Sequence, residues 1–349
     1  MRGLTISAHG GLDQLVYRTD LPKPEPKRGE IRVRVKAAAL NHLDLFVLAG
    51  MPGVTIQPPW ILGADATGSI DAVGDLSGIS DNQLKVGDNV IINPGLADHT
   101  CEYCLAGEQS LCVKFGILGE HAPGTLAEYI VVPAVNARSI PRDKPVEQAA
   151  AFTLATLTAW RMVVTRARVK RGDNVLIWGI GGGVALAALE IVRSIGATAW
   201  VTSHSDDKLA LARGLGAENL LNYSTMDVGK EIRARTSKRG VDVVLDTVGE
   251  ATWQQSLGSL GKRGRLVTCG ATSGPTVQMD VRRLFWNQWD IMGSTMGNDA
   301  EFDAITKEYR AGHFTPLVDS VFDISQGRQA FERLQSGQQF GKIVVRIPE

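Results

Sequence analysis

A cluster of glycines in the middle of the chain has the spacing of a phosphate-binding turn. Gly179, Gly182 and Gly183 follow a short apolar run, 175–178, and precede an Ala- and Leu-rich helical pattern, 186–195. Glycine lets the backbone turn sharply and approach a phosphate without a Cβ in the way. The helix then offers unpaired N–H groups and the positive end of its dipole. This order of strand, turn and helix predicts a site for the pyrophosphate of a dinucleotide.

Three of the four cysteines lie close together in the sequence, at Cys101, Cys104 and Cys112. Thiolates at short spacings are typical zinc ligands. The small number of cysteines and their clustering do not match the disulfide framework of a secreted protein. This distribution therefore favours a metal site.

The residues around the glycine turn alternate between strand and helix patterns. A helix start follows at 205–208, and further strands are predicted at 197–202, 219–222, 241–246, 265–269 and 291–294. Strands alternating with helices at this spacing predict an α/β fold with a doubly wound parallel sheet.

The first part of the chain is richer in strands. Residues 30–36 alternate charged and apolar side chains, the period of a half-buried strand. Shorter runs of this kind predict strands at 68–73 and 89–92, and a helix is predicted at 147–164. The C-terminal segment predicts a helix at 326–335 and a strand at 342–347. We therefore expect a β-rich domain at 1–155 and 298–349, with a dinucleotide-binding domain inserted at 156–297.

Length and composition narrow the class of protein. The 349 residues suffice for two domains, and 37 Lys and Arg balance 37 Asp and Glu. Zero net charge gives no electrostatic reason to expect nucleic acid or an anionic membrane as partner. No apolar run approaches the length of a membrane span, and the first residues carry no signal-peptide core. We expect a cytoplasmic protein with a small-molecule substrate.

The chain resembles the medium-chain dehydrogenase/reductase superfamily, which includes zinc alcohol dehydrogenases and quinone oxidoreductases. Besides the glycine turn, the segments that carry this resemblance are 39–44, 62–68, 73–74, 86–88, 124–129, 158–160 and 341–342. Each segment is a weak motif, but their order along nearly the whole chain is specific. The resemblance implies a GroES-like β-barrel catalytic domain, a Rossmann domain and an active site in the cleft between them.

The resemblance also predicts the cofactor contacts. The turn contributes Gly179, Gly182, Gly183 and Val184, and other residues flank the nicotinamide or close the cleft: Thr158, Val248, Gly270, Ala271, Phe340 and Lys342. An NAD-specific protein would place an acidic residue at the end of the second strand, where this chain has Ser203. A 2′-phosphate could be held by Ser203, His204, Lys208 and Tyr223. We therefore expect NADPH, with NADH as the alternative.

The zinc alcohol dehydrogenases of the superfamily hold a catalytic zinc, but this chain lacks the matching ligands. Asn41 stands at the position of the first cysteine ligand, Ala64 and Asp65 stand at the positions of the His-Glu pair, and Leu154 stands at the position of the later cysteine. Because a catalytic zinc needs three protein ligands, none is expected here. Asn41 could bond the substrate oxygen, and His42 could deliver a proton. Three roles are open for Asp65: it forms hydrogen bonds within its domain, it faces the cofactor, or it ligates a metal together with His42.

A structural zinc is predicted instead. The pattern Asp98-x-x-Cys101-x-x-Cys104-x₇-Cys112 matches the superfamily's four-cysteine lobe, with Asp98 at the first cysteine position. A carboxylate oxygen is an acceptable zinc ligand, and a closed four-ligand site is structural. His99 is an alternative to Asp98 as the fourth ligand. The other possibility is that the lobe binds no metal and its three cysteines are free thiols.

Taken together, these residues predict an NADPH-dependent reductase without a catalytic zinc. Quinones and α,β-unsaturated carbonyl compounds spread the incoming charge by conjugation, so they need less polarisation of the oxygen. Two alternatives are an alcohol dehydrogenase or aldehyde reductase with a remodelled zinc site, and a non-catalytic dinucleotide-binding protein. By analogy we expect a homodimer or homotetramer, because strand 291–294 is where superfamily members pair their sheets.

Overall fold

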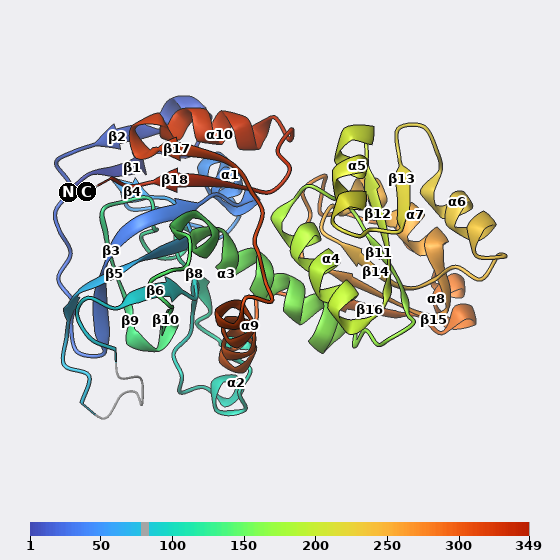
Figure 1. Cartoon of the computed structure of the whole chain (residues 1–349), viewed down its shortest axis with the longest axis horizontal. Helices are drawn as coiled ribbons and strands as arrows, with labels where there is room; N and C mark the ends of the chain where they lie inside the picture. Colours follow the sequence, from blue (N-terminus) through green and yellow to red (C-terminus); the bar gives the residue numbers. More distant parts are fainter. Residues whose placement is uncertain (78–83, 349) are drawn as a thin grey trace. The chain divides into compact units, whose positions relative to one another are not determined.

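The structure is a computed structural model that describes residues 1–77 and 84–348. The chain forms two compact units. The first combines Met1–Leu154 with Gly297–Glu349, and the second is Ala155–Met296 (Figure 1). The C-terminal segment therefore returns to the unit in which the chain begins.

The first unit is built on a seven-stranded sheet in the order β10-β6-β5-β3-β18-β17, with β9 also paired to β3. Strand β18 runs antiparallel to β3, which incorporates the C-terminal segment into this sheet. The strands of the unit are β1 Gly3–Ile6, β2 Val16–Arg18, β3 Glu30–Ala39, β4 Trp60–Ile61, β5 Asp65–Val73, β6 Asn89–Ile92, β7 Gly95–Leu96, β8 Gly116–Ile117, β9 Tyr129–Pro133, β10 Ala137–Ser139, β17 Val318–Asp323 and β18 Lys342–Arg346. Its helices are α1 His42–Ala49, α2 Glu102–Leu105, α9 Asp299–Ala311 and α10 Gly327–Gln335, and α3 Val146–Trp160 begins in it.

Strand β3 contributes side chains to two apolar clusters, and its alternation shifts between Val35 and Ala37, where its pairing with β5 is irregular. Ile31, Val33 and Val35 belong to the large apolar core of the unit. Ala37 and Ala39 belong to a second cluster that also includes Ala150, Ala151 and Val344, from α3 and β18. Small side chains let the backbones of a helix and a sheet approach closely. This packing holds the N-terminal half of α3 against β3 and β18.

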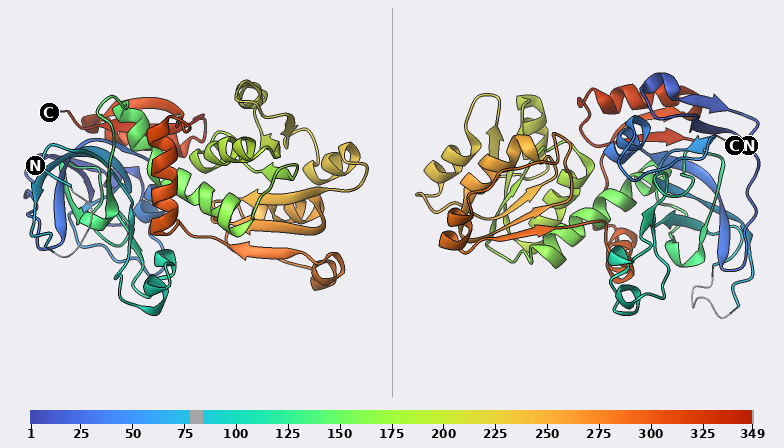
Figure 2. Two further views of the ribbon diagram at one scale, coloured as in Figure 1. Left: turned by 60° about the horizontal axis from the view of Figure 1, so that its bottom comes forward. Right: turned by 180° about the vertical axis from the view of Figure 1, so that it is seen from behind.

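The second unit contains a six-stranded sheet in the order β13-β12-β11-β14-β15-β16, and all of its strand pairs are parallel. Numbered along the unit this order is 3-2-1-4-5-6, the arrangement of a Rossmann domain. Helices lie on both sides of the sheet (Figure 2). The strands are β11 Asn174–Ile177, β12 Thr198–Ser203, β13 Asn219–Asn222, β14 Val241–Asp246, β15 Leu260–Thr268 and β16 Asp290–Gly293. The helices are α4 Gly183–Ile195, α5 Asp206–Gly214, α6 Val228–Arg235, α7 Glu250–Ser259 and α8 Val281–Asn287. The doubly wound fold predicted from the sequence is confirmed.

Several element boundaries differ from the sequence-based prediction. The helix predicted to reach residue 164 ends as an α-helix at Trp160 and continues as a π-helical segment, Arg161–Arg166. Strand β15 starts at Leu260, five residues earlier than predicted, and its pairing with β14 is irregular between Val241 and Val243. Within the described residues, none of the helices has both the length and the apolar character that crossing a membrane would require.

Candidate functional site

The glycine turn lies between β11 and α4, as the sequence predicts. Gly179 and Gly181 adopt φ angles of 69° and 126°, which only glycine adopts without strain. A Cβ on Gly179 would meet no atom within 4 Å, and one on Gly182 would meet only the Gly179 carbonyl oxygen at 3.6 Å. The space over the turn is therefore open to a ligand. The N-terminal N–H groups of α4, which begins at Gly183 with Val184 next, lie at this turn and suit a pyrophosphate.

The end of β12 carries hydroxyl and imidazole groups where an acidic side chain would select NADH. Ser203 is buried, and its Oγ accepts a hydrogen bond from the Ser205 N–H at 3.1 Å. His204 Nδ1 lies 3.1 Å from the Tyr223 hydroxyl. Lys208 is in the first turn of α5, and its backbone N–H is capped by Ser205. The structure thus brings the four predicted residues to neighbouring ends of β12 and β13.

A buried carboxylate organises the turn after β14, which carries the predicted cofactor residue Val248. Asp246 accepts hydrogen bonds from the N–H groups of Val248 and Gly249 and from the hydroxyls of Thr252 and Ser256. No sequence pattern indicates this role, because a strand-final Asp carries no signal of which donors will surround it. Elsewhere, Thr158 is buried with its hydroxyl 3.8 Å from the Met296 sulfur, and Gly270 and Ala271 follow β15.

The first unit contains a buried ion pair at the position where a catalytic zinc would be expected. Asp65 is fully buried, and its Oδ2 accepts hydrogen bonds from Lys342 Nζ at 2.9 Å and Asn41 Nδ2 at 3.0 Å. Its Oδ1 accepts from the Thr153 hydroxyl and from the Leu154 N–H at 2.7 Å. The Lys342 ammonium also donates to the side-chain Oδ1 of Asn41. The strand pairing explains why Asp65 and Lys342 lie together, because β3 pairs with both β5 and β18, and α3 packs against this part of the sheet.

These residues do not fit a catalytic zinc. Both oxygens of Asp65 already accept two hydrogen bonds each, and a cationic ammonium lies beside them. Asn41 is a neutral amide, and Ala64 and Leu154 offer no ligand atom. Asn41 directs its amide N–H groups to Asp65 and, at 3.4 Å, to the Ala39 carbonyl oxygen. A substrate oxygen would therefore have to replace the weak contact with Ala39 to receive a hydrogen bond from Asn41.

Two titratable groups flank this ion pair on α1. His42 begins the helix with an exposed side chain, and the surrounding protein atoms together with the Lys342 charge lower the pKa of its imidazole. A lowered pKa favours the neutral ring near pH 7, and the proton-donor role of His42 stays a prediction. Asp44 is buried and accepts hydrogen bonds from the Asn41 and Gly63 N–H groups, while burial raises its pKa to about 7. Sequence analysis did not single out Asp44.

The cysteine lobe brings its four predicted ligands together. One ligand atom from each of Asp98, Cys101, Cys104 and Cys112 lies within 4.8 Å of the others. Within the described residues this is the one group of three or more His, Cys, Asp or Glu side chains that meets this test. The separation suits tetrahedral zinc, whose bonds to sulfur are about 2.3 Å. His99, the alternative fourth ligand, is not in the group, and its Nδ1 lies 3.7 Å from Asp299 Oδ2.

Hydrogen bonds keep the Asp98 side chain in its charged form. The N–H groups of Thr100 and Cys101 donate to Oδ1 at 2.9 and 3.0 Å, and they hold the pKa of this carboxyl well below its usual range. The carboxylate also lies within hydrogen-bonding reach of the Cys112 and Cys104 thiols. A charged Asp98 is thus directed toward the position that a metal would occupy.

Comparison with known proteins agrees with this arrangement. A model of the alcohol dehydrogenase GroES-like domain matches residues 27–142, and a model of the zinc-binding dehydrogenase domain matches residues 183–310. A zinc-type alcohol dehydrogenase-like protein of Schizosaccharomyces pombe is 32% identical over 345 residues, covering 97% of this chain and 96% of that protein. The chain belongs to the medium-chain dehydrogenase/reductase superfamily. It is therefore an NAD(P)-dependent oxidoreductase with a GroES-like and a Rossmann domain.

Two further relatives of this medium-chain dehydrogenase/reductase point to different substrates. A crystal structure described as an NAD-dependent alcohol dehydrogenase has a TM-score of 0.94 and 40% sequence identity, covering 100% of both chains. An acryloyl-coenzyme A reductase of Sulfurisphaera tokodaii is 26% identical over 329 residues, covering 94% of this chain and 95% of that protein. Superfamily membership is thus established, whereas the substrate depends on the residues at the site.

Proposed function

We propose that this oxidoreductase uses NADPH to reduce quinones or α,β-unsaturated carbonyl compounds, with no metal ion beside the nicotinamide. The observation that carries this proposal is the Asp65 carboxylate at the position of the missing zinc ligands: Lys342 pairs with its Oδ2, and the Thr153 hydroxyl and Leu154 N–H occupy its Oδ1. A simple ketone or alcohol needs strong polarisation of its oxygen, whereas a conjugated acceptor disperses the charge itself.

The chain's own residues then have limited roles in the reaction. The glycine turn and the N-terminus of α4 hold the pyrophosphate of the cofactor. The bound nicotinamide supplies the hydride. Because the Lys342 charge is neutralised by its ion pair with Asp65, the donor for an oxygen that gains charge is the Asn41 amide, which would give up its 3.4 Å contact with the Ala39 carbonyl oxygen. Because the pKa of His42 is lowered, we assign the proton to solvent rather than to an imidazolium.

A substrate screen tests this proposal. We expect the purified protein to oxidise NADPH with a benzoquinone, an enone or an acryloyl thioester, and to do so equally well after treatment with a chelator. Metal analysis should give one zinc per chain or fewer. Turnover of primary alcohols at rates that require zinc, together with two zinc ions per chain, would instead support an alcohol dehydrogenase with a remodelled site. Tight NADPH binding without turnover of any acceptor would support a non-catalytic role.

The preference for NADPH has its own test at the end of β12. Ser203→Asp places a carboxylate where we expect the 2′-phosphate, and its oxygen can still accept the hydrogen bond from Ser205 N–H. We expect the ratio of kcat/KM for NADPH to that for NADH to fall roughly a hundredfold, because charge repulsion acts only on the phosphorylated cofactor.

The matched control for this substitution is Ser203→Ala, which removes the hydroxyl without adding charge. It should change the cofactor ratio far less than Ser203→Asp. An unchanged ratio in Ser203→Asp would show that the 2′-position does not lie at β12, whatever substrate the enzyme uses.

A further inference from the structure

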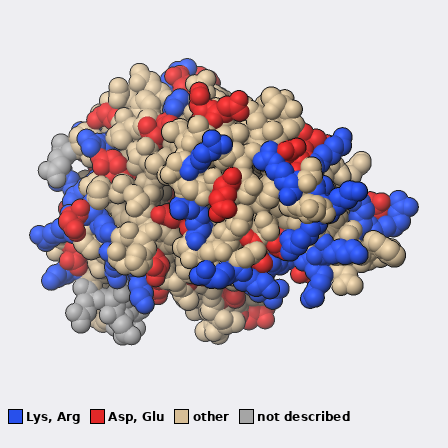
Figure 3. Space-filling model, turned by 45° about the vertical axis from the view of Figure 1, so that its right-hand side comes forward, with Lys and Arg blue, Asp and Glu red and all other residues tan. Residues whose placement is uncertain are grey.

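A basic hollow on the second unit is separate from the glycine turn. It has a volume of about 650 Å³ and lies between α6, α7 and α8. This volume is in the range of small-ligand sites, which run from about 300 to 1,000 Å³. In Figure 3, Lys and Arg side chains gather over the end of this unit. The local charge therefore contrasts with the zero net charge of the whole chain.

Cationic side chains outnumber carboxylates in the lining of the hollow. Lys230, Arg233, Lys238 and Arg283 face a single acidic residue, Asp227. Asp227 is already engaged, because it caps α6 and lies 3.5 Å from Lys230 Nζ. Among the described residues, no carboxylate forms an ion pair with Arg233 or Arg283. Loss of hydration and the charge of Arg283 lower the pKa of Arg233, as expected for neighbouring cations without a counter-ion.

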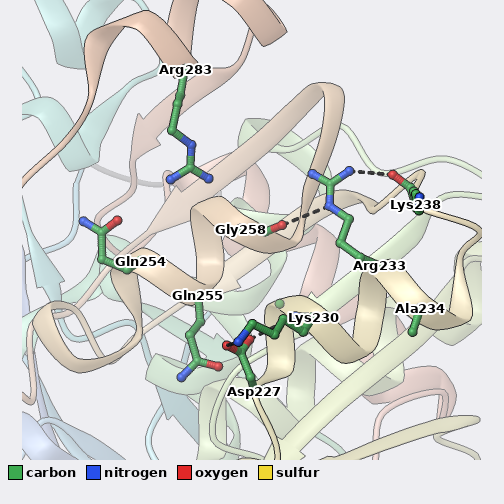
Figure 4. Close-up of a pocket in the computed structure, with 10 residues that line it drawn as sticks. Asp227, Lys230, Arg233, Ala234, Lys238, Gln254, Gln255, Gly258 and Arg283 are labelled. Atoms are coloured by element: carbon green, nitrogen blue, oxygen red, sulfur yellow. Dashed lines mark hydrogen bonds and ion pairs between the residues drawn. The ribbon is translucent and has the colours of Figure 1, made fainter.

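Contacts hold two of these cations, Arg233 and Arg283, in place before any ligand arrives. Figure 4 shows the bonds from Arg233 to the carbonyl oxygens of Gly258 and Lys238. The Arg233 guanidinium donates to the carbonyl oxygens of Gly258, Lys238, Arg239 and Leu260, which leaves one of its five N–H groups. The Arg283 guanidinium lies 5.3 Å from the ring centre of Trp289, a buried residue. Side chains fixed in this way lose little entropy when they bind an anion.

The wall formed by α7 leaves room for a ligand. A Cβ added to Gly258 would meet no atom within 4 Å, so this glycine is not required by packing. Gln255 accepts a hydrogen bond from the Val228 N–H through Oε1 and keeps its Nε2 as a donor in the lining. We propose that this hollow binds a compact polyphosphate, either inorganic or the phosphate portion of a nucleotide. More than one phosphate is inferred because the cations come from separate helices around a cavity larger than a single phosphate.

Calorimetric titration of inorganic pyrophosphate into the enzyme saturated with its nicotinamide dinucleotide tests this proposal. The bound cofactor occupies the glycine turn, so the titration measures pyrophosphate binding at a separate site only. We expect one pyrophosphate per chain, and Arg283→Gln should weaken binding roughly tenfold, the loss of one charge-assisted hydrogen bond. The matched control is Arg282→Gln, since Arg282 is paired with Asp280 and does not line the hollow. Its effect should be less than about twofold.

Filling the hollow gives a second, independent readout. Gly258→Met should abolish binding by occupying the space, whereas Gly258→Ala, a better helix former, should retain it. Melting curves establish whether each variant folds. If Gly258→Met does not fold, the comparison of Arg283→Gln with Arg282→Gln tests the proposal on its own. Tighter binding of adenosine diphosphate than of pyrophosphate would assign a nucleotide, and equal binding an inorganic anion. The proposal is overturned if both arginine variants lose affinity equally, or if a single-stranded oligonucleotide binds without competition from pyrophosphate.

Discussion

Replacing Lys342 by methionine should lower the free energy of unfolding by about 3–5 kcal/mol, because it leaves the Asp65 carboxylate buried without its cation. The side chains of Lys342 and Asp65 are 6% and 0% exposed, so water cannot take over the role of the ammonium. Chemical denaturation measures the loss. A matched control lies on the same strand, because Arg346 pairs with Glu147 but is 63% exposed. Arg346→Met should change stability by less than about 1 kcal/mol.

A double substitution separates the charge effect from simple loss of packing. With Lys342→Met in place, Asp65→Asn removes the buried charge and keeps an oxygen for the Thr153 hydroxyl and Leu154 N–H. We expect this pair of changes to recover most of the lost stability. The single Lys342→Met variant should also raise the pKa of His42, which NMR titration can follow, because the ammonium helps to lower it. A Lys342→Met variant as stable as Arg346→Met would contradict our account of this ion pair.

The fold was largely predictable because its signals are local. Strands such as 241–246 and 219–222 were predicted at their observed bounds, since buried parallel strands are short apolar runs between helices. Helix α9 was missed although Asn298 and Glu301 form a capping box at its start, a signal visible in the sequence. Helix α8 was missed although Val281, Leu284 and Phe285 have helical spacing, because it is only seven residues long and none of its residues is buried. Phe285 and Trp286 are 64% and 77% exposed.

The site was predictable only in part, because its key contact joins distant segments. Lys342 and Asp65 are 277 positions apart, and they meet only because β5 and β18 both pair with β3. The resemblance placed Lys342 near the cofactor and Asp65 near the missing zinc, but no sequence pattern links the two. The raised pKa of Asp44 likewise depends on its complete burial, which an isolated motif does not reveal. The cysteine lobe differs, since its ligands are close in sequence and their spacing alone predicts the cluster.

Loss of the metal from this lobe should be the second large effect. We propose that Asp98, Cys101, Cys104 and Cys112 hold one structural zinc, as their donor atoms and separation suit it. Cys104→Ala should remove the zinc and lower the melting temperature by about 10 °C, because the bound metal contributes folding energy. Metal analysis and thermal unfolding measure both effects. Cys269→Ala is the matched control, since this cysteine follows β15 in the other unit and should leave the zinc content unchanged.

Substitutions at Asp98 distinguish a ligand from a residue that only shapes the turn. Asn in place of Asp98 can still accept the hydrogen bonds from the Thr100 and Cys101 N–H groups, but an amide is a poor zinc ligand. Asp98→Asn should therefore weaken zinc binding at least about tenfold in a chelator competition. Asp98→Cys supplies a thiolate without those hydrogen bonds and should bind zinc at least as tightly as the natural chain. If Asp98→Asn keeps full zinc affinity while Asp98→Cys loses it, the carboxylate organises the turn and another group completes the metal site.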